Sequence, residues 1–494
     1  MLAALVAGMC PALHARDLYV DPKLGSDAAN GLAPGGKDGA GPLKSIARAV
    51  GVAQPGDTIH LAQTVYTEQI GFYGAKSGET GKPITVDGHG ATIKGSVPLD
   101  PKDWKEVAPG LYAGESAEFF KPYMRPKDLQ NAEWADACVG RFSFIFDGKL
   151  NRMNHSVKAP AVPWKAPVDL KPGEWTYEPP PNKLFGRYYV KIDPAKKLAD
   201  CQIEMPVMVS GVQVDGTISH LVFRNITVTH VVNDGFALTP GNEPGSVVRD
   251  IVYRNIRSVE CCDDGLSAHA DCEVDVDGFE VDDCSTGIAS SGTSVNRHLV
   301  LRNIHGKDLV FGGGRHVIED SRIMAHGRSA AVQVWSVWYT NIAALATTAL
   351  KLDNVLLSGA PDDRAASNQI QVGDRRSSVE LAHCTVAGLS VLIRDGANVK
   401  VSDCVIAGGS IDIDAKSNWQ AQRNLYDVDR LVLGAAAYPA ANFEAYRKAT
   451  GQDAASRWMK LEPARLGEGR QRLEIGGAAV GADPARLPAV EQQP

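Results

Sequence analysis

The stretch HLVFRNITV, residues 220–228, recurs along this chain with a constant pattern and a variable spacing. It returns as DIVYRNIRS at 250–258 and as HLVLRNI at 298–304, and weaker copies begin at 278, 316, 350, 378 and 398. Each copy alternates apolar and polar residues, which is the pattern of a strand with one buried face. A unit of this size that recurs predicts a stacked architecture in which each unit buries its apolar face against the next.

The distance between copies changes while the copy itself does not. Counted from one shared polar position, the steps are 30, 28, 20, 17, 34, 29 and 20 residues, for Asn225, Asn255, Asp283, Asn303, Asp320, Asn354, His383 and Asp403. Constant strands joined by loops of different length predict an all-β fold of the parallel β-helix type. Residues at equal offsets then lie above one another, about 4.8 Å apart.

This spacing brings carboxylates together. Asn233-Asp234-Gly235 begins eight residues after Asn225, and Asp263-Asp264-Gly265 begins eight residues after Asn255. Asp234 is therefore expected beside Asp264, with Asp263 close by. Like charges at this distance need a bound cation or a retained proton. We expect these three aspartates to hold Ca²⁺, which prefers hard oxygen ligands, or to share a proton.

Composition limits the classes of partner. The chain has 494 residues, but stacked repeats grow without dividing, so length alone does not set the number of domains. A formal net charge of −7 gives no reason to expect nucleic acid or a membrane surface as a partner. No apolar run is long enough to span a bilayer. We expect a monomer.

The chain divides into five segments by pattern. Residues 1–15 are apolar and end in small residues, which predicts a signal peptide and a secreted or periplasmic protein. Residues 16–118 are expected to form an N-terminal cap, with a helix over 43–53 that protects strand edges, and the first coils. Residues 119–200, rich in Pro, Trp and Tyr, predict an inserted β subdomain. Regular coils are expected over 201–430, and a C-terminal cap with a helix over 443–450, followed by a tail, over 431–494.

Several motifs resemble the right-handed parallel β-helix enzymes that act on polysaccharides, the pectate lyase-like group. The N-terminal part carries Pro55-Gly56-Asp57-Thr58 before a strand and Lys82-Pro83-Ile84-Thr85 after it. The inserted segment carries Phe146-Asp147-Gly148-Lys149 and Leu170-Lys171-Pro172-Gly173-Glu174-Trp175, which resemble the insertion of β-helix glycosidases. The resemblance implies a right-handed coil and a secreted carbohydrate-active enzyme.

The aspartate motif resembles the calcium site of polysaccharide lyase family nine. There, an Asp-Gly-Phe-Ala rung is followed by an Asp-Asp-Gly rung, which matches Asp234 to Ala237 and Asp263 to Gly265 here. The resemblance implies that Asp234, Asp263 and Asp264 bind Ca²⁺. At the family's further aspartate this chain has Ser267, and at the family's catalytic lysine it has Ala289.

The same two rungs also resemble polygalacturonase-type hydrolases, in which they hold the acid and the base. Those enzymes place a histidine on the next coil, where this chain has Thr286. His269, at the end of the Asp-Asp-Gly rung, is the candidate substitute, because its ordinary pKa suits proton transfer at neutral pH. The candidate catalytic residues are therefore Asp234, Asp264 and His269.

Substrate contacts are expected from residues that point outward on later rungs. Trp335, Trp338 and Tyr339 are candidates because exposed aromatic rings stack on sugar faces; packing beneath a long loop is the alternative. Arg394 is a further candidate, near Asp412 and Asp414, whose simplest role is that of solvated ladder positions.

Three functions remain open at this point. The preferred one is β-elimination of an acidic polysaccharide, in which a cation stabilises the enolate-like intermediate and a base removes the α-proton. The first alternative is a glycoside hydrolase with a carboxylate pair, whose separation would be near 5 Å for retention and about 6.5–9.5 Å for inversion. The second is a non-catalytic carbohydrate-binding protein on the same scaffold.

Overall fold

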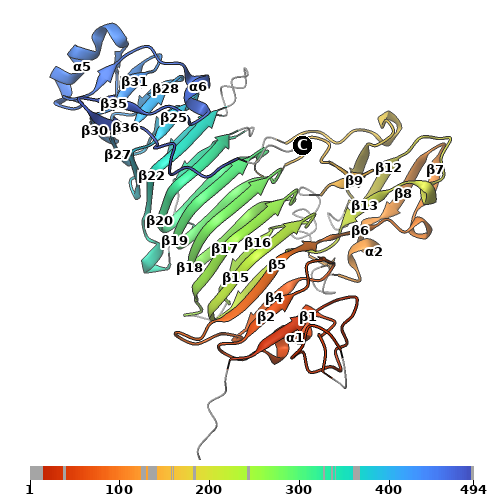
Figure 1. The fold of residues 1–494 in the computed structure, drawn as a ribbon. Coiled ribbons are helices and arrows are strands. Elements are labelled where there is room, and N and C mark those ends of the chain that lie inside the picture. The colour runs from red at the N-terminus through yellow and green to blue at the C-terminus, as the bar shows by residue number, and fades with distance from the viewer. Residues whose placement is uncertain are drawn as a thin grey trace, which may run out of the picture.

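The structure is a computed structural model that describes residues 15–36, 40–123, 129–131, 142–156, 158, 161–181, 185–241, 245–325, 329–334, 338–339, 341–359 and 368–490. Residues 1–14 of the expected signal peptide, and Trp335, lie outside the described residues. The described chain forms one 26-stranded, mainly parallel sheet that runs the length of the molecule (Figure 1). The expectation of a mostly β fold with a large parallel sheet is confirmed.

Copies of the repeat pair with the next copy in parallel, and we call each such step a rung. Leu221 pairs with Ile251 and Arg224 with Arg254, as the 30-residue step predicts. This first row contains β5 (Ile84–Lys94), β15 (Ile218–Thr229), β17 (Val248–Val259), β18 (Asp264–Asp282), β19 (Thr286–Arg302), β20 (Lys307–Ala325), β22 (Thr348–Gly359), β24 (Ser377–Ala382), β27 (Asn398–Ser402) and β30 (Asn418–Gln422).

Two further rows of parallel strands complete the rungs. The second row contains the first residues of β18, β19 and β20, with β4 (Ile70–Gly74), β14 (Val212–Gly216), β16 (Phe236–Thr239), β21 (Val332–Val334), β23 (Gln369–Val372), β26 (Ser390–Ile393), β29 (Ile411–Ile413) and β32 (Leu431–Leu433). The third contains β25 (Thr385–Ala387), β28 (Val405–Ala407), β31 (Leu425–Asp427) and β34 (Arg457–Trp458). This pairing order supports the expected coil-by-coil winding, and its right-handedness stays a prediction.

The shared polar position of the repeat is a left-handed bend. All eight residues counted in the sequence have a φ between 49° and 57°. Asn and Asp enter this region more readily than other residues with a Cβ atom, because their short side chains bond locally. Neighbouring bends also bond to one another: Asn255 Nδ2 donates to Asn225 Oδ1 at 2.9 Å, and Asn354 Nδ2 to Asp320 Oδ1 at 2.7 Å. The motif therefore marks corners, with a strand on each side.

The pairing corrects the sequence count at two of these positions. Asp277 pairs with Arg254 and Phe279 with Ile256, so Gly278, and not Asp283, lies on Asn255. Asp283 and Asn303 belong to a second column of bends, because the residues before them pair with Val259 and with each other. The count failed here because a rung has a left-handed residue at each of two corners. On these two rungs the first corner holds Gly278 and His298, and the Asp or Asn stands at the second corner.

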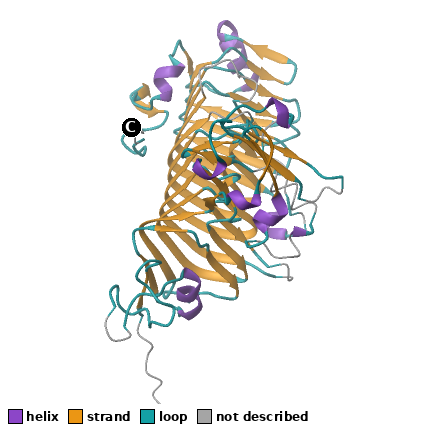
Figure 2. Ribbon diagram, turned by 90° about the vertical axis from the view of Figure 1, so that its right-hand side faces the viewer, coloured by secondary structure: helices purple, strands orange, loops and turns teal. Residues whose placement is uncertain are grey.

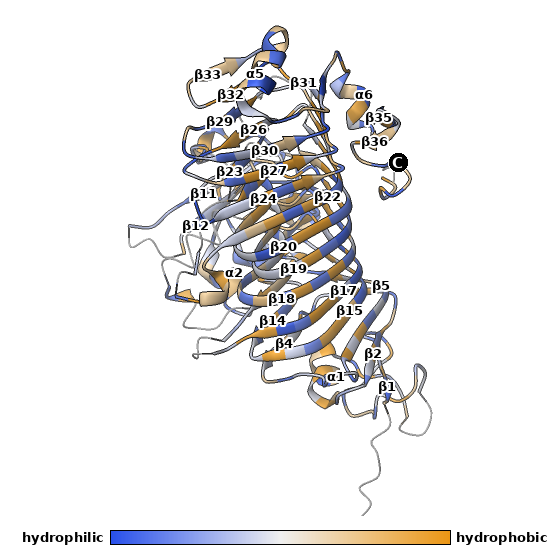
Figure 3. Ribbon diagram, turned by 90° about the vertical axis from the view of Figure 1, so that its left-hand side faces the viewer, coloured by the Kyte–Doolittle hydropathy of each residue, from blue (hydrophilic) through white to orange (hydrophobic). Residues whose placement is uncertain are grey.

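The core fills the interior of the stack. Inward residues alternate with outward ones, which appears as hydrophobic and hydrophilic stripes along the strands (Figure 3). Aromatic rings stack between rungs, with the Phe223 and Tyr253 centroids 5.3 Å apart. Burial on every rung gives the stack one continuous apolar core.

Three short strands and one helix lie at the N-terminal end of the stack. The strands β1 (Asp17–Val20), β2 (Thr58–Leu61) and β3 (Val65–Tyr66) continue the parallel pairing, and helix α1 (Ile46–Val52) packs against them. Ser45 caps α1 by accepting a hydrogen bond from Arg48 N at 3.2 Å, so the helix begins three residues later than predicted. The buried residues Ile46, Ala49 and Val50 form its inner face.

Two antiparallel sheets interrupt the stack and project to its side (Figure 1). One contains β6 (Ser96–Pro98), β9 (Phe144–Phe146), β10 (Lys149–Asn151) and β13 (Ile203–Pro206). The other contains β7 (Lys105–Ala108), β8 (Leu111–Glu115), β11 (Trp175–Glu178) and β12 (Arg187–Lys191), with helix α2 (Ser116–Phe120) beside them. These strands extend beyond both ends of the expected 119–200 and have an aromatic core of their own.

The C-terminal segment first covers the other end and then returns along the stack. Helix α5 (Phe443–Thr450) matches the predicted 443–450, and the hairpin β32–β33 (Ala436–Tyr438) lies beside it. Helix α6 (Pro463–Gly467) and the hairpin of β35 (Leu473–Ile475) and β36 (Ala478–Val480) follow. In Figure 2, short helices lie at both ends of the strand stack, and others lie in front of its middle part. In the described part of the chain, no helix has the length and apolar composition needed to cross a membrane.

Candidate functional site

The three aspartates predicted from the sequence meet at the start of the second row. Phe236 pairs with Leu266, which puts Asp234 on the rung before Asp264, and Asp264 N donates to Asp234 Oδ1 at 3.2 Å. One carboxylate oxygen from each of Asp234, Asp263 and Asp264 lies within 4.8 Å of the others. All three residues are at most 4% exposed. Equal offsets in the repeat thus produced a buried acidic cluster.

The glycine after each aspartate is required by packing. A Cβ atom on Gly265 would lie 2.6 Å from Val281 Cγ1, and one on Gly235 would lie 2.1 Å from Ser258 Oγ. The Asp-Gly pair therefore lets the chain enter the core directly after the carboxylate. This role differs from the turn role that Asp-Gly pairs usually have.

A lysine from the inserted segment completes the cluster. Lys158 Nζ donates to Asp264 Oδ1 and lies 3.6 Å from Asp263 Oδ1. Burial lowers the pKa of Lys158, but the charges of Asp263 and Asp264 outweigh it and hold the pKa above its usual value. Burial raises the pKa of the Asp264 carboxyl, but Lys158 outweighs this and holds it below its usual value. Both groups are therefore ionised at neutral pH.

The segment that carries Lys158 is fastened to the stack at two points. Arg152 is buried; its Nη2 donates to Cys261 O at 3.2 Å and lies 3.2 Å from Asp283 Oδ1. The Ser156 and Ser285 hydroxyls hydrogen-bond at 2.5 Å. Burial raises the pKa of Asp283, and His305 and Arg152 together hold it below its usual value. These contacts set the position from which Lys158 reaches the aspartates.

A second lysine lies farther along the same column. Asp264 pairs with Thr286, and Thr286 pairs with Lys307, so Lys307 is two rungs from Asp264. Lys307 Nζ donates to Gln333 Oε1 at 2.6 Å. Burial, and after it the positive charge of Lys158, hold the pKa of Lys307 below its usual value. The column thus contains buried carboxylates at one end and, at the other, an amine whose pKa lies below its usual value.

His269 and two of the predicted aromatic residues gather beside this column. His269 Nε2 lies 2.7 Å from Ser267 Oγ, and its ring centroid lies 6.3 Å from that of Trp338. The Trp338 indole packs over Gly312, where a Cβ atom would meet it at 2.4 Å, and 38% of the residue remains exposed. Burial raises the pKa of Tyr339, whose hydroxyl contacts the backbone of Ala270. Trp338 and Tyr339 therefore both contact the rung that carries His269.

Arg394 is not part of this group. The column of Leu266 passes through Ile288, Leu309, Val332 and Ile370 to Val391, five rungs on, which is about 24 Å at the spacing of parallel strands. The Arg394 guanidinium lies 3.0 Å from the Asp412 carboxylate. Asp414 accepts hydrogen bonds from two backbone N–H groups of its own turn and from Asp395 N on the neighbouring rung. Residues 394–414 therefore stabilise their own rungs.

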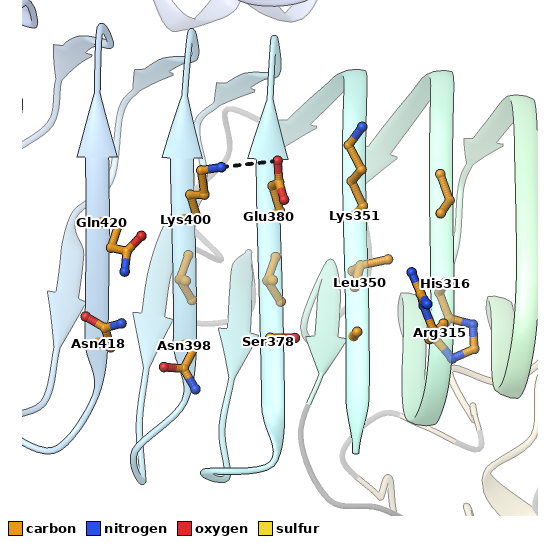
Figure 4. Close-up of a pocket in the computed structure, with 14 residues that line it drawn as sticks. Arg315, His316, Leu350, Lys351, Ser378, Glu380, Asn398, Lys400, Asn418 and Gln420 are labelled. Carbon is orange, nitrogen blue, oxygen red and sulfur yellow. Dashed lines mark ion pairs between the residues drawn. The ribbon is translucent and has the colours of Figure 1, made fainter. Parts of the chain in front are cut away.

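A separate shallow pocket of about 420 Å³ lies on the first row (Figure 4). It crosses β20, β22, β24, β27 and β30, and Lys351, Glu380 and Lys400 stand on neighbouring rungs of it. Lys400 Nζ lies 3.7 Å from Glu380 Oε1. Of the described residues that line it, none belongs to the acidic cluster. Its described lining carries more positive than negative side chains, with Arg315, Lys351 and Lys400 against Glu380.

Sequence reasoning missed both lysines. Lys307 follows Thr286 by 21 residues in the same column, so one further step of the repeat count would have found it. Lys158 is 106 residues from Asp264 and belongs to a segment without the repeat. No periodicity connects it to the site, and only the tertiary structure shows the contact.

Comparisons with known proteins give structural similarities only. No family model matches the chain, and no curated protein matches it. A solved structure described as a glycoside hydrolase has a TM-score of 0.45 and 12% identity, covering 82% of this chain and 96% of its own. A complex of XylC with xylose has a TM-score of 0.43 and 13% identity, covering 84% of this chain and 70% of its own. Pectate lyase Pel9A has a TM-score of 0.40 and 13% identity, covering 83% of this chain and 80% of its own. At these scores and identities the matches assign neither a family nor an activity to this chain.

Proposed function

We propose that this chain is an enzyme that cleaves an acidic polysaccharide by β-elimination, with the sugar chain lying across the rungs between Asp264 and Gln333. The observation that carries the proposal is the column of Asp264, Thr286 and Lys307 with Lys158 over one end. It combines buried carboxylates, a fixed positive charge and an amine with a lowered pKa. Perturbed groups that converge in this way are typical of catalytic sites.

Lys307 is the proposed base. β-Elimination removes the proton beside a carboxylate, so it needs a base in its neutral form and positive charge near the developing enolate. Burial and Lys158 favour the neutral amine of Lys307, which then accepts the α-proton at Nζ. Lysine suits this role because its pKa responds strongly to burial. Gln333, which accepts a hydrogen bond from Lys307, orients the amine.

Lys158 is the proposed partner of the substrate carboxylate. Its ammonium group stays charged because Asp263 and Asp264 hold its pKa high. A uronate carboxylate that approaches Lys158 gains a charge-assisted hydrogen bond, which orients the α-proton toward Lys307. His269 and Trp338 border the same rungs, and we propose that they contact neighbouring sugar units.

We also propose that the acidic cluster binds Ca²⁺. The donor set fits: Asp234, Asp263 and Asp264 offer hard oxygen ligands within 4.8 Å of one another, and with Lys158 the four residues carry a formal charge of −2. When bound, Ca²⁺ would add positive charge beside the substrate carboxylate and so acidify its α-proton. Residues 1–15 support export, and we propose that the enzyme acts outside the cytoplasm.

One observation favours a glycoside hydrolase as a second candidate. One carboxylate oxygen of Asp234 and one of Asp264 lie within 4.8 Å of each other, below the about 6.5–9.5 Å separation of inverting enzymes, so a hydrolase here would be of the retaining type. Such an enzyme needs one of the two carboxyls protonated, whereas Lys158 holds the pKa of Asp264 low. We therefore rank hydrolysis below elimination, and a carbohydrate-binding protein without activity below both.

The test is a panel of acidic and neutral polysaccharides, each incubated with the protein in Ca²⁺ or in EDTA. Unsaturated ends, measured by absorbance, identify elimination, and new reducing ends without them identify hydrolysis. Lys307→Met is expected to lower kcat/KM by about 10²–10⁴, the usual contribution of a general base. Lys351→Met, at a lysine paired with Asp353 away from the site, is the matched control. Saturated products, or full activity of Lys307→Met, would reject the elimination mechanism.

A further inference from the structure

A second group of metal-ligating side chains lies at the N-terminal end of the stack, on three neighbouring strands. Tyr19 of β1 pairs with His60 of β2, and His60 pairs with Asp87 of β5. His60 Nδ1 faces His89 Nε2 at 2.9 Å. One oxygen of Asp87 and one nitrogen from each histidine lie within 4.8 Å of one another. Two imidazoles and a carboxylate therefore point to one small volume.

The outer side of His60 fixes its tautomer. His60 Nε2 lies 2.9 Å from Asp17 Oδ1, and a carboxylate there requires a proton on that nitrogen. The neutral ring then presents the lone pair of Nδ1 to His89. A carboxylate on the outer nitrogen is also the partner that metal-bound histidines usually have, because it holds the ring and makes the inner nitrogen more basic. Tyr19 stacks on the His60 ring, with centroids 5.1 Å apart, and restricts it further.

Asp87 is preorganised as an ionised ligand. Its carboxylate accepts hydrogen bonds from Arg224 Nε at 2.7 Å, Asn225 Nδ2 at 2.9 Å and His89 N at 3.0 Å. Burial raises the pKa of Asp87, but these donors outweigh it and hold the pKa below its usual value. The carboxylate therefore carries a full negative charge beside the two rings at neutral pH.

The geometry leaves room for a cation and for its entry. Two nitrogens bound to one tetrahedral ion at about 2.05 Å stand about 3.3 Å apart, so the present 2.9 Å needs to widen only slightly. The His89 side chain is 49% exposed and lines a surface hollow with Asn225 and Asn255. His89 lies at the bend within β5, with a φ of 49°, and its half-exposed ring has room to adjust.

We propose that His60, His89 and Asp87 form a binding site for a divalent transition ion of the zinc class, distinct from the acidic cluster around Asp264. Imidazole nitrogens select Zn²⁺, Cu²⁺ or Ni²⁺ over Ca²⁺, whereas three carboxylates do the reverse. The ion would join β2 to β5, and through Asp17 it would also hold β1. The site pins the first strands of the stack and does not depend on the proposed enzymatic activity.

The experiment uses the full chain after treatment with EDTA. Titration with Zn²⁺ is expected to show one equivalent bound and a rise in Tm of about 2 °C or more, since a ligand of the folded state stabilises it. His60→Ala and His89→Ala should lose both effects. His383→Ala is the matched control, because His383 is 51% exposed and paired with Asp353 at 3.1 Å. Asp264→Asn should keep the zinc effect, which separates this site from the acidic cluster.

Two results would overturn the proposal. The first is a wild-type Tm and heat of titration that Zn²⁺ leaves unchanged, in which case the histidine pair binds only a proton. The second is unaltered zinc binding by both histidine variants. If the variants do not fold, Co²⁺ added to the wild-type protein decides the matter: nitrogen ligation gives visible absorption bands that EDTA removes, and their absence contradicts the site.

Discussion

At the scale of single residues, Lys158 determines the electrostatics of the acidic cluster. Three buried carboxylates share this one ammonium group, which touches Asp264 and lies 3.6 Å from Asp263. A buried ion pair adds little net stability, yet removal of one partner is costly because the other charge stays buried. Variants at this pair therefore report on stability as well as on chemistry.

The first prediction concerns Asp264→Asn. We expect a loss of about 3 kcal/mol in the free energy of unfolding at pH 7, because Lys158 loses its nearest carboxylate. The folded-state pKa of Asp264 lies below that of an unfolded aspartate, about 3.9. The stabilisation is therefore present above that pH and lost as the pH falls through the folded-state pKa. Urea unfolding at several pH values measures the difference, and equal stability of both proteins at pH 7 would contradict it.

A second prediction separates a metal site from an acid–base pair. If the cluster holds Ca²⁺, calcium raises the Tm of the wild-type protein and not that of Asp264→Asn. Asp412→Asn, at a carboxylate paired with Arg394, is the control and should keep the calcium effect. If the carboxylates act as an acid and a base, EDTA changes nothing and Asp264→Asn abolishes activity. Thermal unfolding with and without calcium distinguishes these outcomes.

A third prediction follows from the effect of Lys158 on Lys307. A base is active when deprotonated, so kcat/KM should rise with pH through the pKa of Lys307, which lies below its usual value. Lys158→Met removes a positive charge and is expected to raise that pKa, which moves the rising limb to higher pH. Lys165→Met, on the same inserted segment but paired with Glu174, should leave the limb in place. A limb that does not move in Lys158→Met would argue against Lys307 as the base.

At the scale of elements, the bends between strands set the shape of each rung. Asn225 and Asn255 hold the left-handed conformation, and their side chains hydrogen-bond to each other between neighbouring rungs. We expect Asn255→Ala to lower the free energy of unfolding by about 1–2 kcal/mol, because alanine has no polar side chain to offset the cost of the left-handed conformation. Asn255→Gly should cost less, because glycine adopts the conformation freely. Thr227→Ala, on a regular strand, is the control, and denaturant unfolding gives the comparison.

At the scale of the whole molecule, the inserted segment leaves the stack and rejoins it at neighbouring residues. Gly95 O accepts hydrogen bonds from Val207 N at 2.9 Å and Met208 N at 3.1 Å, so the chain leaves and rejoins the stack at one place. Its two sheets have their own core, and its contacts with the stack include Arg152 and Lys158. The segment thus brings a charged side chain to a scaffold that folds around a separate core.

This arrangement predicts the result of an excision. Replacing residues 96–206 by a short Gly-Ser linker should leave the parallel sheet folded, as circular dichroism will show. It should also remove activity on each substrate that the full chain cleaves, because Lys158 is lost with the segment. Lys158→Met in the full chain is the companion variant and should lower activity on the same substrates without abolishing it. Unchanged activity of the excised protein on every substrate would reject a role for the segment in catalysis or selection.

The repeat pattern alone was enough to predict the parallel sheet and the acidic cluster. In a stack of repeats, the number of residues between two copies sets which residues pair. Leu221 pairs with Ile251, and Asp234 lies on the rung before Asp264, since both pairs are 30 residues apart. The same spacing misled the count at Asp283 and Asn303. On these two rungs the Asp or Asn stands at the second corner, and Gly278 and His298 stand at the first.

The compensation of the cluster and the environment of Lys307 could not be predicted from the repeat. Lys158 reaches Asp264 over 106 residues through a segment with no repeat, so no offset predicts the contact. The lowered pKa of Lys307 depends on burial and on Lys158, neither of which is a property of its neighbours in sequence. Periodic packing is encoded locally in the chain, whereas burial and charge at a site come from segments that fold onto it from elsewhere.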